Sequence, residues 1–342
     1  MVKTLPLHKA LENLSLPGLE RNLFSSPAWL SVLYETYKLK LFVKYIEREG
    51  KIAGYIVYSV VSNFLEDKIC VCSYCDYCDY HVSTQEDWQA FFDSLRQEYP
   101  QYRIAIRNLR DTIVRQNPNF QILSKERFHI IDIRPSPDAL WGNMYDAFRR
   151  AVKQSQKSGV TTRVCGKSEL YKFYDQHLRL RKSKYRLFPQ PLKFFENIWK
   201  IYMDKDRGVL LGAYDGKGRF IAGTVYLQCG NTFYYKFNTS ALNALHLRPN
   251  NLLMWEGIKI AKERNLEYLD LGSSGYEQQG LILFKNHAGA ACHDICHLGY
   301  TPPDYKFSRK IILSVFTRFC TLPWMPNAVL RLGSQWIYPY LA

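Results

Sequence analysis

The sequence predicts an α/β protein with two lobes in tandem and a short helical tail. Segments with the period of strands alternate with segments with the period of helices along most of the chain. A short motif also recurs. Ile52-Ala53-Gly54 and Ile221-Ala222-Gly223 each follow a polar Gly/Lys turn and each begin a strand. This echo indicates two copies of one αβ unit. The 342 residues are enough for two domains of roughly 100–200 residues each.

The first lobe is expected to span residues 1–137, up to a Pro-rich boundary at Arg134-Pro135-Ser136-Pro137. Its first helix is predicted at residues 24–39, because Ser26 can cap it and Pro27 suits its first turn. Strands are expected at residues 41–47, 52–61, 68–74, 102–106 and 128–133, and a second helix at residues 86–98.

The second lobe is expected to span residues 138–304, and it opens with one long helix from Asp138 to Gly159. Strands are expected at residues 160–164, 209–214, 220–228 and 232–238, and helices at residues 168–182 and 194–203. The tail, residues 305–342, reads as two short basic amphipathic helices interrupted at Pro323 and Pro326.

The stretch from Arg248 to Ala290 carries the strongest functional pattern. Arg248-Pro249-Asn250-Asn251 signals a helix start, and Tyr268–Gly272 reads as a short buried strand that ends in an acid and a glycine. A polar loop then leads to Lys285 in apolar surroundings. Because a helix N-terminus beside an arginine can hold an anion, this stretch predicts a phosphate-binding site next to the end of a strand.

These residues resemble the second lobe of the Fem-type branch of the GNAT acyltransferase superfamily. The resemblance rests on residues 247–255, Tyr268–Gly272 and Phe284-Lys285 with Gly289, and it extends from about Asp138 to Tyr300. The branch includes peptidoglycan aminoacyltransferases and GNAT-like proteins of envelope-polysaccharide loci. The resemblance implies two GNAT-like lobes with mixed β-sheets and a cleft between them.

Three residues are candidates for a catalytic role. Lys285 matches the lysine of the Phe-Lys…Gly signature, where the resemblance implies contact with an anionic substrate or developing negative charge; alternatively, its stem only reaches solvent. Asp270 could orient the acceptor amine or Lys285, or could cap the end of its strand. Tyr235 could line the same cleft, or could be an ordinary cross-strand partner.

Further residues are candidates for binding the substrate and the donor. Arg149, Arg150 and Lys153 match the arginine-rich helix that opens the second lobe in this family, although charge runs are usually solvated helix faces. The other candidate substrate contacts are Lys236, Asn238, Asp76 and Tyr77. Arg248, Asn250 and Asn251 are candidates for holding the phosphates of an acyl-CoA cofactor, with the amides of Asn251 and Leu252 as further donors. They stand where a GNAT protein usually carries a Gln/Arg-x-x-Gly-x-Gly/Ala loop, and Fem-type relatives use aminoacyl-tRNA without such a loop.

Charge and composition limit the partners. The formal net charge is +15, with 46 Lys and Arg against 31 Asp and Glu, which favours a polyanionic partner such as a phosphorylated carrier, tRNA or a membrane surface. We expect a phosphorylated or lipid-linked envelope precursor as acceptor, a tRNA partner as an option and no DNA. The N-terminal residues show no secretory signal, so a cytoplasmic protein is expected, with peripheral contact to the inner face of the membrane through the tail as an option.

Four of the nine cysteines are crowded together at Cys70, Cys72, Cys75 and Cys78. Their spacing could ligate zinc or an iron–sulfur cluster, but no partner Cys-x-x-Cys pair stands elsewhere in the chain. We therefore expect no metal, with these thiols acting as small apolar side chains.

The sequence therefore predicts an N-acyltransferase that modifies an amine on a polysaccharide or peptidoglycan precursor. The closest enzymatic alternative is an aminoacyl-tRNA-dependent transferase. From a different class, a GNAT-like lobe that has lost its donor site would act as a non-catalytic binding protein. No Ser-His-Asp arrangement is needed for such chemistry, because an amine can attack a thioester or aminoacyl ester directly.

Overall fold

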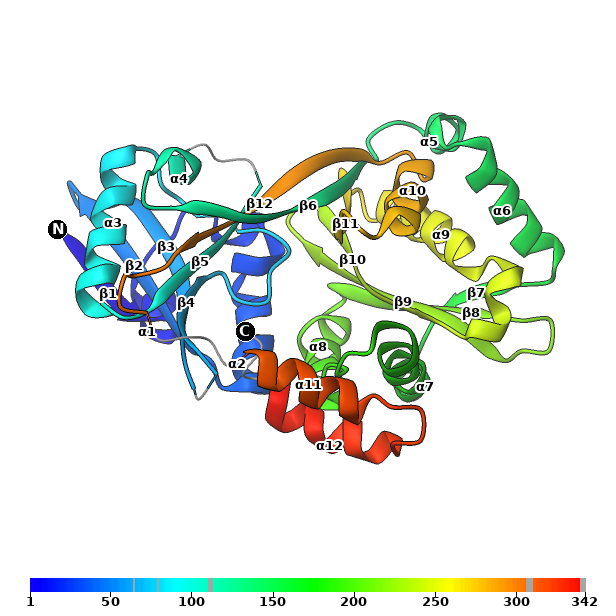
Figure 1. The fold of residues 1–342 in the computed structure, drawn as a ribbon. Helices are drawn as coiled ribbons and strands as arrows, with labels where there is room; N and C mark the ends of the chain where they lie inside the picture. Colours follow the sequence, from blue (N-terminus) through cyan, green and yellow to red (C-terminus); the bar gives the residue numbers. More distant parts are fainter. Residues whose placement is uncertain (64, 79, 110–112, 306–309, 339–342) are drawn as a thin grey trace. The chain divides into compact units, whose positions relative to one another are not determined.

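The computed structural model describes residues 1–63, 65–78, 80–109, 113–305 and 310–338 (Figure 1). The chain forms two compact units. Unit 1 comprises Met1–Glu126, Asp294–Phe316 and Ile337–Ala342, and unit 2 comprises Arg127–His293 and Thr317–Trp336. The division expected from the sequence keeps residues 305–342 as a separate tail, whereas the two units share these residues between them.

Unit 1 is a mixed sheet with the strand order β1-β2-β3-β4-β5-β12. The chain passes through β1 (Val2–Pro6), α1 (Leu7–Asn13), α2 (Pro27–Tyr37), β2 (Lys40–Arg48), β3 (Lys51–Ser62), β4 (Asp67–Val71), α3 (Gln85–Glu98), β5 (Arg103–Asn108) and α4 (Ile113–Gln116). The Ser26 side chain accepts a hydrogen bond from the Trp29 amide, which confirms the predicted cap of α2.

Unit 2 is a second mixed sheet, with the strand order β6-β11-β10-β9-β8-β7. Its elements are β6 (Gln121–Asp132), α5 (Pro137–Asn143), α6 (Asp146–Lys157), β7 (Thr161–Val164), α7 (Lys167–Leu180), α8 (Leu192–Ile201), β8 (Gly208–Tyr214), β9 (Phe220–Cys229), β10 (Thr232–Ser240), α9 (Pro249–Glu263), β11 (Tyr268–Gly275) and α10 (Gln279–His287). Within unit 2, α6 and α9 cover one face of the sheet, and α7 and α8 cover the other (Figure 1).

The two units repeat one topology. In each, four strands pair antiparallel in chain order, and a helix then leads to a fifth strand that pairs parallel with the fourth. The predicted internal repeat is confirmed, because Gly54 lies on β3 and Gly223 on the corresponding strand β9. The cleft expected between the lobes stays a prediction.

Each repeat gives its sixth strand to the other sheet. β6 follows α4 in the chain but lies beside β11 of unit 2. β12 (Ala291–Tyr300) follows α10 but pairs antiparallel with β5 of unit 1, where Leu298 faces Ile106. This exchange could not be predicted from the sequence, because strand patterning does not identify the neighbouring strand.

Three secondary-structure predictions for the second lobe were wrong. The helix expected from Asp138 to Gly159 is broken at Met144 and Tyr145, whose backbones are extended. There the Tyr145 amide donates to the carbonyl oxygen of His287 at 3.0 Å, so a tertiary contact replaces a helical hydrogen bond. Lys285 lies on the helix α10 and not in a loop. β11 also continues to Gly275, so Asp270 lies inside its strand and not at its end.

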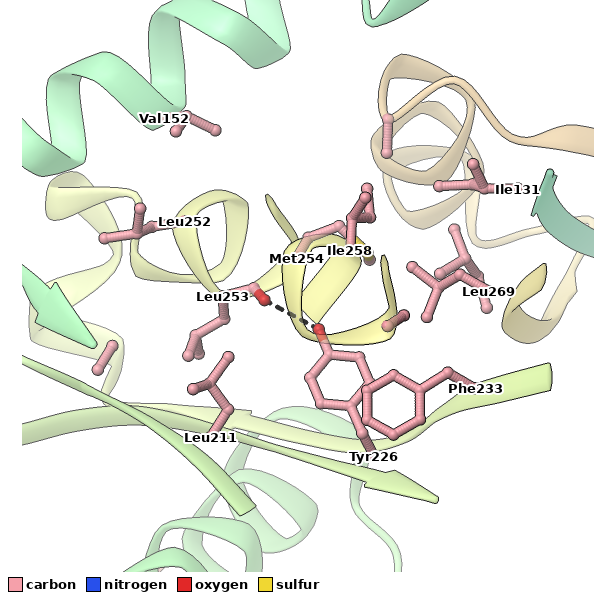
Figure 2. Close-up of a cluster of buried hydrophobic side chains, with 14 of the residues drawn as sticks. Ile131, Val152, Leu211, Tyr226, Phe233, Leu252, Leu253, Met254, Ile258 and Leu269 are labelled. Atoms are coloured by element: carbon pink, nitrogen blue, oxygen red, sulfur yellow. Dashed lines mark hydrogen bonds between the residues drawn. The ribbon is translucent and has the colours of Figure 1, made fainter. Parts of the chain in front are cut away.

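Buried apolar side chains fix α9 on the sheet of unit 2. The Tyr226 hydroxyl of β9 donates to the Leu253 carbonyl of α9 at 2.9 Å, and the Phe233 ring stacks against Tyr226 (Figure 2). A Cβ atom at Gly257 would lie 2.3 Å from the Tyr226 hydroxyl oxygen, so only glycine allows this approach. These contacts hold the N-terminus of α9 in place.

The predicted pair of C-terminal helices is confirmed as α11 (Lys310–Cys320) and α12 (Asn327–Ile337). Pro323 and Pro326 lie between them, and the predicted tail residue Arg309 lies outside the described residues. In the part of the chain that the structure describes, no helix has both the length and the apolar composition needed to cross a bilayer.

Candidate functional site

The parallel strands β10 and β11 pair over only three positions, from Thr232 with Tyr268 to Tyr234 with Asp270. Beyond this point β10 changes register against β9 between Tyr235 and Phe237, which marks a β-bulge. Both strands nevertheless continue for several residues. Beyond Tyr234 and Asp270, their backbone groups are therefore not engaged in mutual β-pairing, and they could pair with an extended ligand.

The bulge brings three of the predicted residues together around Thr224. The Asn238 side-chain amide donates to the Thr224 hydroxyl at 2.8 Å and lies 3.4 Å from the Asn250 side-chain oxygen. Asn250 in turn reaches the Ser240 hydroxyl at 3.4 Å. Tyr235 also interacts with Thr224, and burial raises the pKa of its phenol above the ordinary value. This polar cluster joins β10 to the first turn of α9.

Arg248 immediately precedes α9 and has a left-handed backbone, with φ of 56°. This conformation is uncommon for a residue with a side chain and is often found at functional sites. No side chain caps the start of α9, and its first turn contains no acid. The Asn251 amide already donates to the Arg248 carbonyl at 3.2 Å, so this predicted amide donor is occupied.

A pocket of about 390 Å³ opens at the start of α9. It is lined by Ala147, Phe148, Arg150, Ala151 and Gln154 of α6, by Arg248 and Asn251, and by Phe284 and His287 of α10. Two guanidinium groups and no carboxylate border it, so its electrostatic potential favours an anion. Phe148 and Phe284 contact each other with ring centroids 5.6 Å apart and supply an apolar wall.

The structure separates the three predicted basic residues of α6. Arg150 lines the pocket, whereas Lys153 is exposed and is not part of the lining. Arg149 donates to the carbonyl oxygens of Trp141 and Gly142 at 3.3 and 2.8 Å and pairs with Asp146. Arg149 therefore holds the end of α5, and only Arg150 is placed to meet a ligand in this pocket.

Asp270 and Lys285 both hold the backbone at Gly272. An Asp270 carboxylate oxygen accepts from the Gly272 amide at 2.7 Å. The Lys285 ammonium donates to the carbonyls of Gly272 and Ser273 at 3.0 and 2.9 Å. Gly272 has φ of 68°, which interrupts the regular strand geometry and lets two consecutive carbonyls reach one ammonium.

Both side chains are almost fully buried, with 1% of Asp270 and 3% of Lys285 exposed. Asp270 and Lys285 are therefore positioning residues, because their contacts hold the backbone in the second half of β11. A direct action of Lys285 on a substrate charge stays a prediction.

Comparisons with known proteins agree with this geometry. Residues 143–279 match the model of the acetyltransferase (GNAT) domain family. This segment is similar to a GNAT domain. No curated protein matches the sequence.

Solved structures show the same fold over both units. The crystal structure of FemX has a TM-score of 0.65 and 13% identity, covering 92% of this chain and 100% of FemX. A tandem GNAT protein from the clavulanic acid biosynthesis pathway has a TM-score of 0.54 and 9% identity, covering 90% and 100%. The C-terminal domain of a putative lysylphosphatidylglycerol synthetase from Agrobacterium fabrum has a TM-score of 0.52 and 10% identity, covering 89% and 94%. The tandem GNAT-like fold predicted from the sequence is confirmed.

Several residues of unit 2 were not predicted from the sequence. His129 of β6 is buried, and burial together with the charge of Lys285 lowers its pKa to about 4. Its signal in the sequence is a single histidine inside an apolar strand, Phe128-His129-Ile130. Gln154 and His287 in the pocket wall gave no such signal, because their positions depend on how α6 and α10 pack against α9.

The remaining predicted residues are not among those that line the pocket. Lys236 occupies the bulge of β10 and is half-buried. Asp76 and Tyr77 belong to unit 1, where the Tyr77 ring contacts Phe24 with centroids 5.5 Å apart. Their role toward an acceptor stays a prediction.

The four crowded cysteines also belong to unit 1, and all are buried. The Cys75 thiol donates to the Cys72 carbonyl at 2.7 Å, and the Cys78 thiol donates to the Val71 carbonyl at 3.1 Å. Among the residues that the structure describes, no three His, Cys, Asp or Glu side chains are grouped to hold a metal ion. Each of these two thiols therefore donates to a backbone carbonyl only a few residues earlier in the chain.

Proposed function

We propose that this protein transfers an acyl or aminoacyl group from a phosphorylated donor to an amine on a cell-envelope polysaccharide or peptidoglycan precursor. The observation that carries the proposal is the basic pocket at the uncapped start of α9, beside the point where β10 and β11 cease to pair. The GNAT domain supports the reaction class, and the putative lysylphosphatidylglycerol synthetase among the similar structures is consistent with an aminoacyl donor.

The pocket suits the nucleotide end of either donor. Acyl-CoA and aminoacyl-tRNA both carry phosphates close to an adenosine. Arg150 and Arg248 would pair with phosphate oxygens, for which guanidinium groups have matching geometry. The Phe148 and Phe284 rings offer a surface for a base, and about 390 Å³ lies within the usual range for small-molecule sites.

The parts of β10 and β11 beyond Tyr234 and Asp270, which do not pair with each other, would hold the chain that leads from the phosphates to the acyl group. Backbone amides and carbonyls there can pair with an extended, amide-containing donor. Asp270 and Lys285 keep the Gly272 backbone fixed, so the ligand meets a preorganised strand.

In the reaction, the acceptor amine attacks the carbonyl carbon of the thioester or ester. A C–N bond forms, the C–S or C–O bond breaks, and the proton lost by the amine balances the one gained by the leaving sulfur or oxygen. Burial raises the pKa of Tyr235, so its phenol is protonated at neutral pH; it can give its proton to the leaving atom and recover one from the amine. Binding the two reactants together supplies most of the remaining rate enhancement.

The experiment is a thermal-shift series with acyl-CoAs, aminoacyl-tRNA, UDP-sugars and duplex DNA. A ligand at 100 times its Kd stabilises the folded state by about 2.7 kcal/mol, so a donor should raise the Tm by several degrees. The double variant Arg150→Met, Arg248→Met should lose this shift, and Lys153→Met on the same helix should keep it. The proposed donor site is contradicted if no donor raises the Tm or if the double variant responds like the parent.

A non-catalytic binding protein is the second candidate. It is favoured by the missing Gly-rich loop before α9 and by the occupied Asn251 amide. Donor binding without release of free thiol or deacylated tRNA in the presence of amine acceptors would support it.

A further inference from the structure

The C-terminal segment of unit 2 carries an exposed apolar face. On α11, Phe319 is 58% exposed. On α12, Leu332 is 63% exposed and Trp336 is 75% exposed. Trp324, in the connection between the helices, is 74% exposed. Exposed side chains of this size grouped on one short segment mark an interaction surface.

The opposite side of the same segment is firmly held, so the exposed face is a fixed surface. Cys320, Leu330 and Ser334 are buried. The Lys182 ammonium donates to the carbonyls of Pro323 and Met325 at 3.1 and 2.6 Å, and Arg186 donates to the Thr321 carbonyl at 2.9 Å. These contacts tie the connection between α11 and α12 to the turn after α7.

The charged side chains of the C-terminal segment itself are all positive. After Asp304 the sequence contains no Asp or Glu, but it contains Lys306, Arg309, Lys310, Arg318 and Arg331. The turn after α7, which holds the connection, adds Lys184 and Arg186, and both are exposed. Arg331 is paired with Asp175, and Arg318 is exposed.

We propose that the part of α11 from Thr317 onward, the Trp324 connection and α12 up to Trp336 form a docking site for the surface of an anionic phospholipid bilayer. Apolar and tryptophan side chains would enter the interface between headgroups and acyl chains, while the surrounding Lys and Arg contact lipid phosphates. Tryptophan is enriched at this interface because its ring is apolar and its N–H is polar. A second copy of the same face is disfavoured as the partner, because two surfaces of equal positive charge repel each other.

The helices would lie in the plane of the membrane. Each contains 11 residues and is therefore about 16 Å long, roughly half the thickness of the hydrocarbon core. Peripheral binding of this kind is reversible, and it weakens when salt screens the lipid charge.

Vesicle co-sedimentation tests the proposal with the full chain. The protein should sediment with vesicles of phosphatidylglycerol mixed with phosphatidylcholine and should stay in the supernatant with phosphatidylcholine alone. About 1 M salt, where the screening length is about 3 Å, should release much of the bound protein. Brominated acyl chains in the anionic vesicles should quench tryptophan fluorescence.

The decisive variant is Trp324→Ser, Trp336→Ser, which should weaken binding about tenfold or more and remove most of the quenching. Val164→Ser, Leu242→Ser alters two similarly exposed residues of unit 2, at 57% and 55%, and should bind like the parent. Thermal melts establish that both variants fold. Failure to bind anionic vesicles, or parent-like binding by the tryptophan variant, would overturn the proposal.

Sedimentation velocity identifies the competing occupant. A dimer of the parent protein that the tryptophan variant converts to a monomer, without any vesicle binding, would show that the face pairs two copies and would also overturn the proposal. None of these measurements needs turnover, so their outcome is independent of the proposed transferase activity.

Discussion

The helices α3 and α9 occupy the same place in the two repeats, yet their N-termini differ. The Thr84 side chain caps α3 by accepting from the Asp87 amide, and Glu86 and Asp87 lie in its first turn. Arg48 pairs with the Asp87 carboxylate. In contrast, α9 follows Arg248, has no side-chain cap and has no acid in its first turn.

This difference shows how one topology supports two kinds of surface. The positive end of α3 is neutralised by the protein's own carboxylates, which leaves no attraction for a bound anion. The positive end of α9 faces a pocket bordered by Arg150 and Arg248. The fold alone therefore does not make a phosphate site, and the phosphate site that we propose lies at the start of α9.

Acid should produce the largest difference between the units, because unit 2 buries two histidines with lowered pKa values. Burial and Lys285 lower the pKa of His129 to about 4, and burial and Arg181 lower that of His177 to about 3. In the unfolded chain both titrate near 6.5. As pH falls below about 6.5, the unfolded state binds the protons first, and stability decreases by about 1.4 kcal/mol per pH unit for each histidine down to about pH 4.

Urea unfolding at several pH values measures this slope, and hydrogen exchange should show amides of unit 2 opening before those of unit 1. The variants His129→Leu and His177→Leu should each reduce the slope. A double variant with the same pH dependence as the parent would show that neither histidine is responsible.

Replacing Lys285 by Met should lower the free energy of unfolding by about 3 kcal/mol, because the Gly272 and Ser273 carbonyls lose a buried donor. If Lys285 instead acted directly on a substrate charge, the same change would lower turnover at least tenfold with almost no change in Tm. Urea and thermal unfolding distinguish the two expectations. An unchanged Tm with reduced turnover would restore the direct catalytic role.

The comparison residue in unit 1 is Lys44, which is also fully buried and donates to Thr4 and Ser94 at 2.8 and 2.9 Å. Its ion-pair partner Glu98 is 40% exposed and can be hydrated when the lysine is removed. Lys44→Met should therefore cost less stability than Lys285→Met and should leave donor binding unchanged.

The smallest expected effect comes from giving α9 the acidic turn of α3. Asn251→Asp should weaken binding of a phosphorylated donor about tenfold, because the new carboxylate pairs with the pocket arginines. An acid in the first turn should also stabilise the helix by about 0.3–1 kcal/mol, so the Tm should hold or rise. Isothermal titration and thermal melts measure the two effects.

The matched change in unit 1 is Asp87→Asn. It should lower stability, because Arg48 loses its partner, without altering donor affinity. Equal donor affinity in Asn251→Asp and the parent would place the phosphates somewhere other than at the start of α9.

Local sequence signals predicted much of the fold. Ser26-Pro27 marked a helix start, the Ile-Ala-Gly echo marked the repeat, and Arg248-Pro249 marked the start of α9, all correctly. Such features depend on neighbours in the chain. The break at Tyr145 could not be predicted, because its cause is the His287 carbonyl on a distant helix.

Part of the candidate site could also be predicted from the sequence. Arg150, Arg248 and Asn251 were identified and do line one pocket. Arg149 and Lys153 have the same charge and lie on the same helix, but packing directs them elsewhere. The role of Lys285 was the hardest to infer, because the sequence does not show that a positive φ at Gly272 presents two carbonyls to one side chain.

The exchange of β6 and β12 constrains the order in which the protein can fold during its synthesis. Unit 1 obtains its last strand from residues that leave the ribosome after nearly all of unit 2. Until then the edge of β5 has no partner and can pair with other chains. The N-terminal repeat therefore stays incomplete while the C-terminal repeat is synthesised. This repeat is the part of the nascent chain with the greatest need for a chaperone.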